Sequence, residues 1–316
     1  MKSSGLLLCL CLLEAASAFK ICAFNAQHFG NSKAANAKVM STIVRIISRC
    51  DVCLIQEVHD QKGRAVTALI NALNRNNKDK YEYLASERLG RNSYQEQYVF
   101  VFRSDRLKVK DKYQYPDQQK GDIDAFSREP FVVRFEAPHT AIKDLVLIPQ
   151  HTSPSNATKE IDELYDVFQE VKRLWRIDNA MFLGDFNAAC GYVAKKNWKT
   201  IRLYSEPGFT WLIDHKTDTT VRQTTECAYD RIVVHGDALL RGIVPQSAKP
   251  FNFAAAFGLT EEEALEVSDH YPVEVELKEV RASGRGLLLS SYAKQALGLP
   301  APTARAVVPT HNTTAI

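Results

Sequence analysis

The pattern of hydrophobic and polar residues predicts a chain that alternates between strands and helices. Eight apolar runs have the length and the β-branched or aromatic content of strands. They are KICAFN (20–25), CDVCLIQE (50–57), YVFVFR (98–103), FVVRFE (131–136), LVLIPQH (145–151), MFLGDFN (181–187), RIVVH (231–235) and YPVEVEL (271–277). A polar–apolar alternation over residues 107–113 is compatible with an antiparallel partner strand.

Two segments between these strands have helical spacing. In residues 37–50 one face carries Val39, Ile43, Ile46 and Ile47, and in residues 158–175 one face carries Ile161, Leu164, Val167, Phe168 and Val171. The sequence has no repeat of fixed period and no sign of a second core. We therefore expect α/β layers in which sheets pack together and helices cover the outside.

The two ends of the chain differ from its middle. Residues 1–18 combine a lysine, the apolar run 6–13 and a small-residue end, which predicts a signal peptide cleaved after Ala18 and a secreted protein; a buried N-terminal helix is the alternative. Residues 281–316 contain four lysines and arginines and no acid, and are rich in Ala, Pro, Ser and Thr. This composition favours a solvated tail over a dedicated binding element and leaves residues 19–280 as one domain.

The cysteines and the net charge narrow the function classes only slightly. Of the seven cysteines two lie in the predicted signal peptide, so five remain and at least one is unpaired or bonds another molecule. Cys50 and Cys53 form a C-x-x-C pair, but it leads into a strand and not into a helix, so structural pairing is favoured over redox chemistry. A net charge of +3 is compatible with a polyanionic partner. Asn156 and Asn312 lie in glycosylation sequons.

Polar residues end several of the apolar runs. These residues are Asn25, Glu57, His151, Asp185 and Asn187, and Asp269 and His270 directly precede the last run. Each one alone is more often a turn, a cap or a satisfied histidine, but so many strand ends of this kind predict a polar site at one sheet edge. Carboxylate and amide oxygens favour Mg²⁺ or Ca²⁺, and histidines favour proton transfer, so the set fits phosphoester cleavage.

A series of motifs makes the sequence similar to a known family. FNAQHFG, IQEV, LGRNSYQEQYVFVFR, FSREPFVVRF, IDELYDVF, GDFNAAC, CAYDRIV and SDHYPVEV resemble, in this order, the deoxyribonuclease I family from Phe19 to about Leu277. KICAFN, the RCD step, SREPFVV and the basic tail resemble the gamma branch of that family most. The resemblance implies a four-layer α/β sandwich of two central, mainly antiparallel β-sheets flanked by helices, the endonuclease/exonuclease/phosphatase type. It also implies a secreted endonuclease that cleaves DNA with little sequence specificity, leaves 5′-phosphate ends and requires Mg²⁺ and Ca²⁺.

The resemblance also implies roles for individual residues. His151 and His270 would be the acid/base pair, oriented by Glu96 and Asp230 respectively, because a carboxylate on one ring nitrogen fixes the tautomer and raises the basicity of the other. The residues implied to bind a divalent metal and the scissile phosphate are Asn25, Glu57, Asp185, Asn187 and Asp269. The residues implied to bind calcium are Asp218 and Thr220 in one loop and Asp117, Asp124 and Glu129 in another; plain polar turns are the alternative for both loops.

The resemblance also implies contacts with DNA that do not depend on its base sequence. Tyr94 and Arg128 would face double-stranded DNA, and chromatin is a further potential target. His59 stands where the type member has a minor-groove arginine, so we expect a pH-dependent contact there instead. Leu84, Ala85 and Phe131 depart from the actin-binding surface of the type member, so we expect no tight actin complex. We also expect a monomer. The basic tail is the segment expected to reach membranes or chromatin if it binds anything.

The family pattern further implies a Cys190–Cys227 disulfide, and Cys22 with Cys50 as a weaker candidate that leaves Cys53 buried and free. The small disulfide of the second calcium loop in the type member is missing, because residues 115–128 contain no cysteine. Two other functions stay open. One is a related metal-dependent phosphodiesterase acting on lipid or sugar phosphates, and the other is a non-catalytic extracellular DNA-binding protein. Hydrolysis of duplex DNA compared with hydrolysis of phospholipid separates these functions.

Overall fold

The computed structural model describes residues 18–78, 80–118 and 123–280. The predicted signal peptide, apart from Ala18, the predicted basic tail 281–316 and the sequon at Asn312 lie outside the described residues. Of the helices within the described ranges, none has both the length and the apolar character needed to cross a membrane.

Two six-stranded sheets form the centre of the structure. The first has the order β11 (Lys249–Pro250), β12 (Val273–Leu277), β1 (Phe19–Phe29), β2 (Val52–Val58), β4 (Gln97–Arg103) and β3 (Tyr81–Ala85). The second has the order β5 (Lys108–Gln114), β6 (Phe131–Glu136), β7 (Asp144–Pro149), β8 (Ala180–Asp185), β10 (Asp230–His235) and β9 (Phe209–Trp211). Only the neighbours β1/β2 and β7/β8 are parallel, so the expectation of mainly antiparallel sheets is confirmed.

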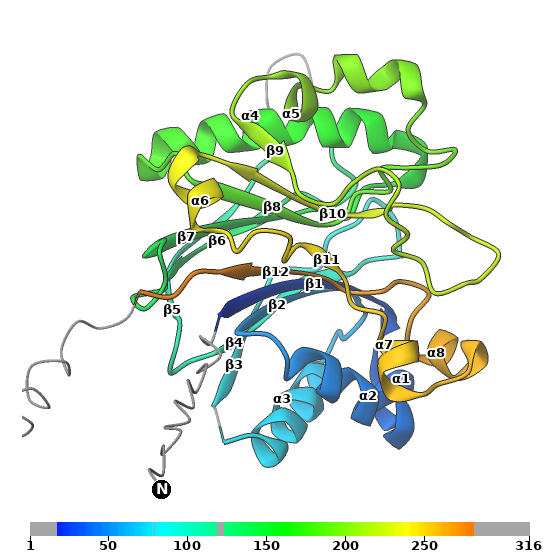
Figure 1. Cartoon of the computed structure of the whole chain (residues 1–316). Coiled ribbons are helices and arrows are strands. Elements are labelled where there is room, and N and C mark those ends of the chain that lie inside the picture. The colour runs from blue at the N-terminus through cyan, green and yellow to red at the C-terminus, as the bar shows by residue number, and fades with distance from the viewer. Residues whose placement is uncertain (1–17, 79, 119–122, 281–316) are drawn as a thin grey trace, which may run out of the picture. The chain divides into compact units, whose positions relative to one another are not determined.

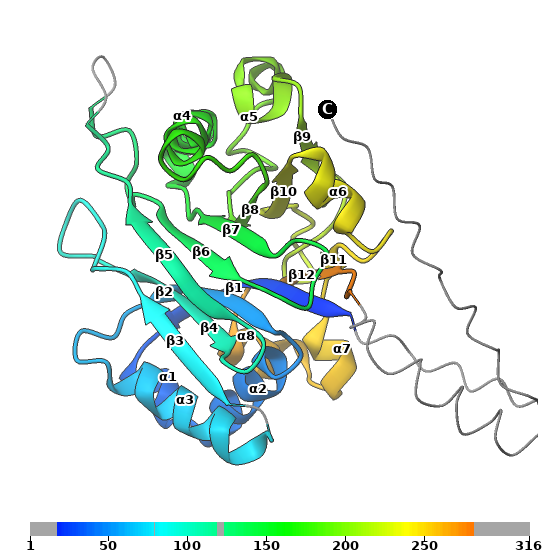
Figure 2. The same cartoon turned by 90° about the vertical axis from the view of Figure 1, so that its left-hand side faces the viewer.

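Helices cover the outer face of each sheet, which gives four layers (Figures 1 and 2). The helices by the first sheet are α1 (Asn31–Ala35), α2 (Ala37–Ile47), α3 (Arg64–Asn76), α7 (Phe253–Phe257) and α8 (Glu261–Val267). The helices by the second sheet are α4 (Ala157–Trp175), α5 (Arg202–Ser205), α6 (Asp237–Gly242) and the 3₁₀ turns η1 (Pro154–Asn156) and η2 (Lys195–Thr200). The predicted α/β four-layer sandwich is therefore confirmed.

The continuous apolar runs of the central strands follow from burial on both faces. In β1, Ile21 belongs to the core between the sheets and Phe24 to the core under the helices of the first sheet. In β8, Leu183 belongs to the core between the sheets and Phe182 to the core under α4. Because side chains alternate between faces, a strand with a core on each side has no polar face in the middle.

Both predicted helices form close to their expected bounds. The side chain of Asn36 accepts hydrogen bonds from the backbone N–H groups of Lys38 (3.1 Å) and Val39 (3.3 Å) and so caps α2 at its start. The apolar residues of α2 and α4 that show helical spacing are buried. The Cys22–Cys50 disulfide then ties β1 to the turn after α2, and Cys53 is the free, buried cysteine among the described residues.

Candidate active site

Irregular strand ends aim polar side chains of the first sheet out of its core. The register between β1 and β2 shifts between Asn25 and Phe29, and the register between β2 and β4 shifts between Ile55 and Val58. Glu57, inside the second shift, has a positive φ of 56°. Bulges of this kind re-aim a side chain at a sheet edge. The two shifts therefore turn Asn25 and Glu57 towards each other, and the Asn25 amide donates to Oε1 of Glu57 at 3.0 Å.

Asp185, at the end of β8 in the second sheet, lies at the centre of the cluster. Its Oδ2 accepts a hydrogen bond from the Asn25 amide at 3.2 Å. The same oxygen lies 3.5 Å from Nε2 of His151 and 3.7 Å from Nε2 of His270. Burial raises the pKa of Asp185, but the two imidazoles and the hydrogen bonds from Asn187 and Asn25 outweigh it and lower this pKa, so the residue is a carboxylate.

Each of the two histidines has a carboxylate on its other ring nitrogen. Nδ1 of His151 lies 2.5 Å from Oε1 of Glu96, and Nδ1 of His270 lies 2.7 Å from Oδ2 of Asp230. Both carboxylates are buried. The two histidine–carboxylate pairs expected from the sequence are thus present, and both direct Nε2 at the same oxygen of Asp185.

These carboxylates change the proton affinity of both imidazoles. Burial by itself lowers the pKa of His151, but the charge and hydrogen bond of Glu96 raise it above its ordinary value in spite of nearby Arg128. Burial also lowers the pKa of His270, and the charges of Asp230 and Asp185 raise it well above the ordinary value. Both rings are therefore able to hold a proton near neutral pH.

A buried amide joins the two sheets beneath the cluster. Nε2 of Gln56 donates to the carbonyl of Gln150 at 2.6 Å, and Oε1 of Gln56 accepts from the backbone N–H of Asp185 at 2.9 Å. Gly184 has φ +130°, and a Cβ there would lie 2.4 Å from the Gln150 carbonyl oxygen. The glycine of the GDFN motif therefore makes room for the link that positions Asp185 and His151.

Two charged residues that the sequence did not reveal support the site. Lys33 donates to the carbonyls of Ala26, Gln27 and Val267 and so holds the bulge of β1. Burial lowers the pKa of Lys33 to about 8, against the opposing effect of Glu57 and Asp269.

Glu160 on α4 is the second of these residues. It accepts hydrogen bonds from the Gln150 side chain (2.9 Å), the Ser153 backbone (3.2 Å) and the Ser127 hydroxyl (3.1 Å), which are neighbours of His151 and Arg128 in the sequence. A buried polar residue within the apolar pattern of α4 is the sequence signal that could have indicated Glu160.

The predicted metal ligands divide into three groups. Asn25, Glu57 and Asp185 are linked as described, and Oδ1 of Asp269 lies at the edge, 3.9 Å from Nε2 of His270. The backbone N–H of Asn187 donates to Asp185 at 2.9 Å, and its side-chain amide donates to the carbonyl of Thr152 at 3.2 Å. The other five predicted ligands lie in two separate loops.

In the first of these loops, oxygens of Asp117, Asp124 and Glu129 lie within 4.8 Å of one another. Burial and then the charges of Asp117 and Asp124 raise the pKa of Glu129. Carboxylates crowded in this way repel one another, and a cation relieves the repulsion.

The second loop is held mainly by its own hydrogen bonds. Oδ1 of Asp218 accepts from the backbone N–H (3.0 Å) and hydroxyl (2.6 Å) of Thr220 and from the backbone N–H of Cys227 (3.2 Å). Three protein donors on one oxygen are typical of a polar turn. The Cys190–Cys227 disulfide predicted from the family pattern is formed beside it.

The residues predicted to face DNA lie next to the histidine pairs. Tyr94 is 47% exposed, and Arg128 is only 9% exposed. Arg128 donates through Nε to the His151 carbonyl at 2.9 Å and lies 3.3 Å from Oε1 of Glu96. Tyr94 and Arg128 line one pocket of about 280 Å³, together with Arg91, Ser127 and Ser153 among others. Nε2 of His59 contacts the Tyr94 hydroxyl at 3.1 Å, so His59 belongs to the same surface.

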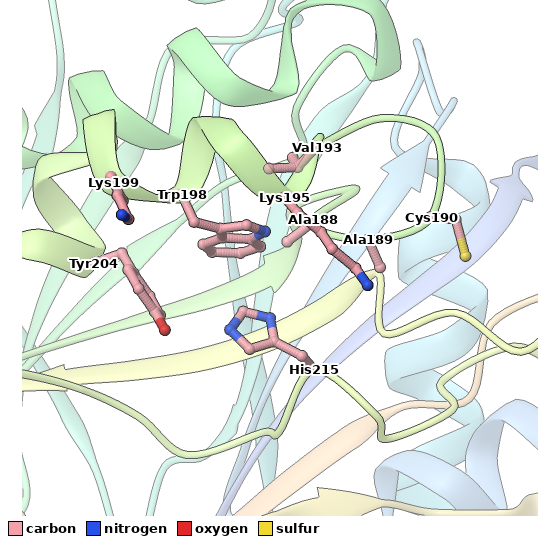
Figure 3. A pocket seen from close by; sticks show the side chains of 9 residues that line it. All are labelled: Ala188, Ala189, Cys190, Val193, Lys195, Trp198, Lys199, Tyr204 and His215. Carbon is pink, nitrogen blue, oxygen red and sulfur yellow. The ribbon is translucent and has the colours of Figure 1, made fainter.

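A larger pocket of about 530 Å³ lies beside the GDFNAAC segment (Figure 3). The rings of Trp198, Tyr204 and His215 lie close together in it, and Lys195 and Lys199 also line it. Beneath the rings the buried Arg231 donates to His215 (3.1 Å) and to three backbone carbonyls. None of the carboxylates or histidines of the Asp185 cluster lines this pocket, so the candidate active site lies outside it.

Comparison with known proteins places the chain among nucleases and phosphatases. The model of the endonuclease/exonuclease/phosphatase family matches residues 22–270. Deoxyribonuclease gamma of Homo sapiens is 50% identical over 279 residues, which cover 88% of this chain and 92% of that protein. Deoxyribonuclease-1 of Sus scrofa is 50% identical over 268 residues, which cover 84% of this chain and 94% of that protein. The two kinds of relative thus match at equal identity, and the expected resemblance to the deoxyribonuclease I family, its gamma branch included, is confirmed.

Solved structures of low identity share the fold. An endonuclease/exonuclease/phosphatase from Bacteroides vulgatus superposes with a TM-score of 0.57 at 15% identity and covers 84% of this chain and 100% of that chain. A family protein from Leptotrichia buccalis superposes with a TM-score of 0.58 at 15% identity and covers 82% of this chain and 99% of that chain. These likenesses concern the four-layer architecture alone.

Proposed function

The chain belongs to the endonuclease/exonuclease/phosphatase family and, within it, to the deoxyribonuclease I family, and from this premise we propose that it is a metal-dependent endonuclease that hydrolyses DNA phosphodiester bonds. The relatives that match over most of their length are named deoxyribonucleases. We also propose that the cleavage has little sequence specificity and leaves 5′-phosphate ends.

One observation of the structure supports the proposal most strongly. Two buried histidine–carboxylate pairs, one from each side of Asp185, direct their Nε2 atoms at the same oxygen, at 3.5 Å for His151 and 3.7 Å for His270. Hydrolysis of a phosphodiester needs one group that takes a proton from water and another that gives a proton to the leaving oxygen. The two imidazoles face one point through Nε2, and a carboxylate fixes Nδ1 of each ring. This arrangement suits the uptake of one proton and the release of another.

The proposed reaction is an in-line displacement at phosphorus. One imidazole takes a proton from the attacking water as the new P–O bond forms. The P–O3′ bond breaks, and the other imidazole gives its proton to the O3′ leaving group. The products are a 5′-phosphate and a 3′-hydroxyl, and the two imidazoles have exchanged protonation states. Glu96 and Asp230 hold each ring in the tautomer whose Nε2 faces the substrate.

The donor set at the centre fits a hard divalent cation. The Asn25 amide nitrogen donates to Oε1 of Glu57 at 3.0 Å and to Oδ2 of Asp185 at 3.2 Å, so two carboxylate oxygens meet at this point, and no thiolate lies among these residues. Such oxygen sets suit Mg²⁺. When bound, Mg²⁺ would offset the negative charge that grows on the phosphoryl oxygens. We further propose that Ca²⁺ binds the carboxylates of Asp117, Asp124 and Glu129 and stabilises their loop, and that Asp218 and Thr220 form a weaker calcium site.

Substrate contacts come from the pocket next to the histidine pairs. The guanidinium of Arg128, held against the His151 carbonyl, and the exposed ring of Tyr94 line this pocket together. A guanidinium recognises phosphate in any sequence, and a tyrosine hydroxyl does the same. This arrangement supports DNA backbone contact with little base specificity.

The two disulfides agree with the oxidising compartment in which a secreted protein folds. Secretion itself, a monomeric state and the lack of tight actin binding remain predictions.

A plasmid-nicking assay with Mg²⁺ and Ca²⁺ varied separately tests the proposal. We expect nicking that requires Mg²⁺ and is strengthened by Ca²⁺, and no comparable release of headgroup from phospholipid vesicles. Hydrolysis of the phospholipid with intact plasmid would favour the related phosphodiesterase instead. Plasmid binding without either reaction would favour a non-catalytic DNA-binding protein.

A further inference from the structure

A second cluster of metal-ligating side chains lies on the other face of Glu57. Nδ1 of His28, Nε2 of His59 and a carboxylate oxygen of Glu57 belong to residues whose ligand atoms lie within 4.8 Å of one another. Nδ1 of His28 is 3.8 Å from Oε2 of Glu57, and the two imidazole rings lie 5.2 Å apart. The side chain of His28 is 62% exposed, so solutes reach the cluster from water.

The backbone holds the three residues in place. His28 lies within the register shift of β1 and has a positive φ of 56°, and its N–H donates to Oε2 of Glu57 at 3.0 Å. The N–H of His59 donates to the carbonyl of Phe29 at 2.8 Å, which fixes the end of β2 beside the end of β1. The cluster therefore rests on two paired strand ends and not on a free loop.

Both imidazoles already point at one position. The hydroxyl oxygen of Tyr94 lies 3.3 Å from Nδ1 of His28 and 3.1 Å from Nε2 of His59. A hydroxyl has one proton and can donate it to only one of these nitrogens. A dication held between these two nitrogens and Oε2 of Glu57, beside the Tyr94 hydroxyl, would accept a lone pair from each nitrogen and a third from the carboxylate. Imidazole nitrogens favour Zn²⁺ and similar transition metals, whereas Mg²⁺ and Ca²⁺ favour oxygen ligands.

We propose that His28, His59 and Oε2 of Glu57 form a binding site for a dication of the Zn²⁺ class, which shares only the carboxylate of Glu57 with the oxygen-ligand site at Asp185. Water or the Tyr94 hydroxyl completes the coordination. An arginine at position 59, as in the type member of the deoxyribonuclease I family, could not ligate a metal, so the site depends on the histidine of this chain.

The two sites use different oxygens of one carboxylate. Oε1 of Glu57 accepts from Asn25 at 3.0 Å and lies 4.0 Å from Nε2 of His151, whereas Oε2 faces His28. Metal binding at Oε2 therefore does not rest on the proposed function.

The test measures Zn²⁺ binding directly. The full chain, freed of metal with a chelator and kept in excess Mg²⁺ and Ca²⁺, is titrated with Zn²⁺ by calorimetry and with Co²⁺ by visible absorption. We expect one site that His28→Ala and His59→Ala each weaken at least about tenfold. His139→Ala, which removes an exposed histidine elsewhere, leaves the affinity unchanged. His59→Arg serves as a second variant because the type member of the family carries this residue.

Equal Zn²⁺ affinity of the wild type and the His28 and His59 variants would overturn the site. So would a loss of affinity confined to Asp185→Asn, which would place the metal at the candidate active site. Binding that persists in a protein without nuclease activity would refute the proposed function and leave the site standing.

Discussion

Replacing Gly184 by alanine tests whether the link beneath the site positions its chemistry. An added Cβ would lie 2.4 Å from the Gln150 carbonyl oxygen and 2.6 Å from Nε2 of Gln56. Gln56 cannot simply turn away, because it holds Gln150 at 2.6 Å and the N–H of Asp185 at 2.9 Å. The φ of Gly184 is also +130°, a conformation that alanine rarely adopts.

The two effects add to a large loss of stability. Overpacking a buried position costs about 1–3 kcal/mol, and an unfavourable backbone conformation costs about 1–3 kcal/mol more. Gly184→Ala should therefore lower the free energy of unfolding by roughly 2–6 kcal/mol, a large part of the about 5–15 kcal/mol typical of a domain. Because Asp185 and His151 adjoin the displaced groups, a shift of about 1 Å should also lower the cleavage rate by about 100-fold.

Gly191 is the matched control for this change. A Cβ at Gly191 meets nothing within 4 Å, so Gly191→Ala should change the free energy of unfolding by less than about 1 kcal/mol. Denaturant unfolding with the disulfides intact and a nicking assay on the folded protein measure both effects. The reasoning is refuted if Gly184→Ala unfolds within about 0.5 kcal/mol of Gly191→Ala and cleaves DNA at the wild-type rate.

Three other predictions concern Glu160, the Cys190–Cys227 disulfide and the predicted tail. Burial raises the pKa of Glu160 to about 7, so the folded protein binds a proton that the unfolded chain releases near pH 4.5. The free energy of unfolding should then fall by on the order of 3 kcal/mol from pH 4.5 to 7, relative to Glu160→Gln in parallel denaturant titrations, and a constant difference would contradict this. Removing the Cys190–Cys227 disulfide by a double alanine substitution should cost about 3–4 kcal/mol in thermal unfolding, and peptide mapping that finds a free Cys190 thiol in the wild type would contradict the pairing. Truncation after Glu279 should leave the cleavage of short naked duplexes unchanged and weaken action on nucleosomal or liposome-bound DNA, and equal activity on all three would show that residues 281–316 are only a solvated extension.

The central strands and two helices were predictable because their burial is periodic along the chain. A strand such as β8, with a core on each face, reads as a continuous apolar run. The helix α3 was not predicted, although its buried residues have helical spacing. Its first N–H groups are capped by Asp60, which accepts from Arg64 at 2.9 Å and Val66 at 2.8 Å and lies before Gly63, so the usual signal at the helix start is missing.

The short strands β3 and β9 were missed for a different reason. β3 pairs only with β4, and β9 only with β10, so both lie at sheet edges. Edge strands are partly exposed and lack the apolar pattern of central ones. Their existence depends on a partner that is distant in sequence, which local periodicity does not contain.

The candidate site also combines residues that could be predicted from the sequence with residues that could not. Strand-end residues such as Asp185 and His151 could be selected because polar groups are unusual at the end of a buried run. The family resemblance supplied Glu96 and Asp230 as their partners. The Gln56 link to Gln150 spans 94 positions in the sequence, and nothing near either residue indicates the other.

The central claim is that His151 and His270 carry the two proton transfers of DNA cleavage, and the single-turnover rate on a defined duplex tests it most directly. His151→Asn and His270→Asn are measured at saturating Mg²⁺ and Ca²⁺, with His139→Asn as the control for a surface histidine. Since a positioned acid or base contributes about 10²–10⁴-fold, each of the two variants should lose at least about 100-fold in rate while the control cleaves normally. A folded His151→Asn or His270→Asn that cleaves within about tenfold of the control would contradict the account.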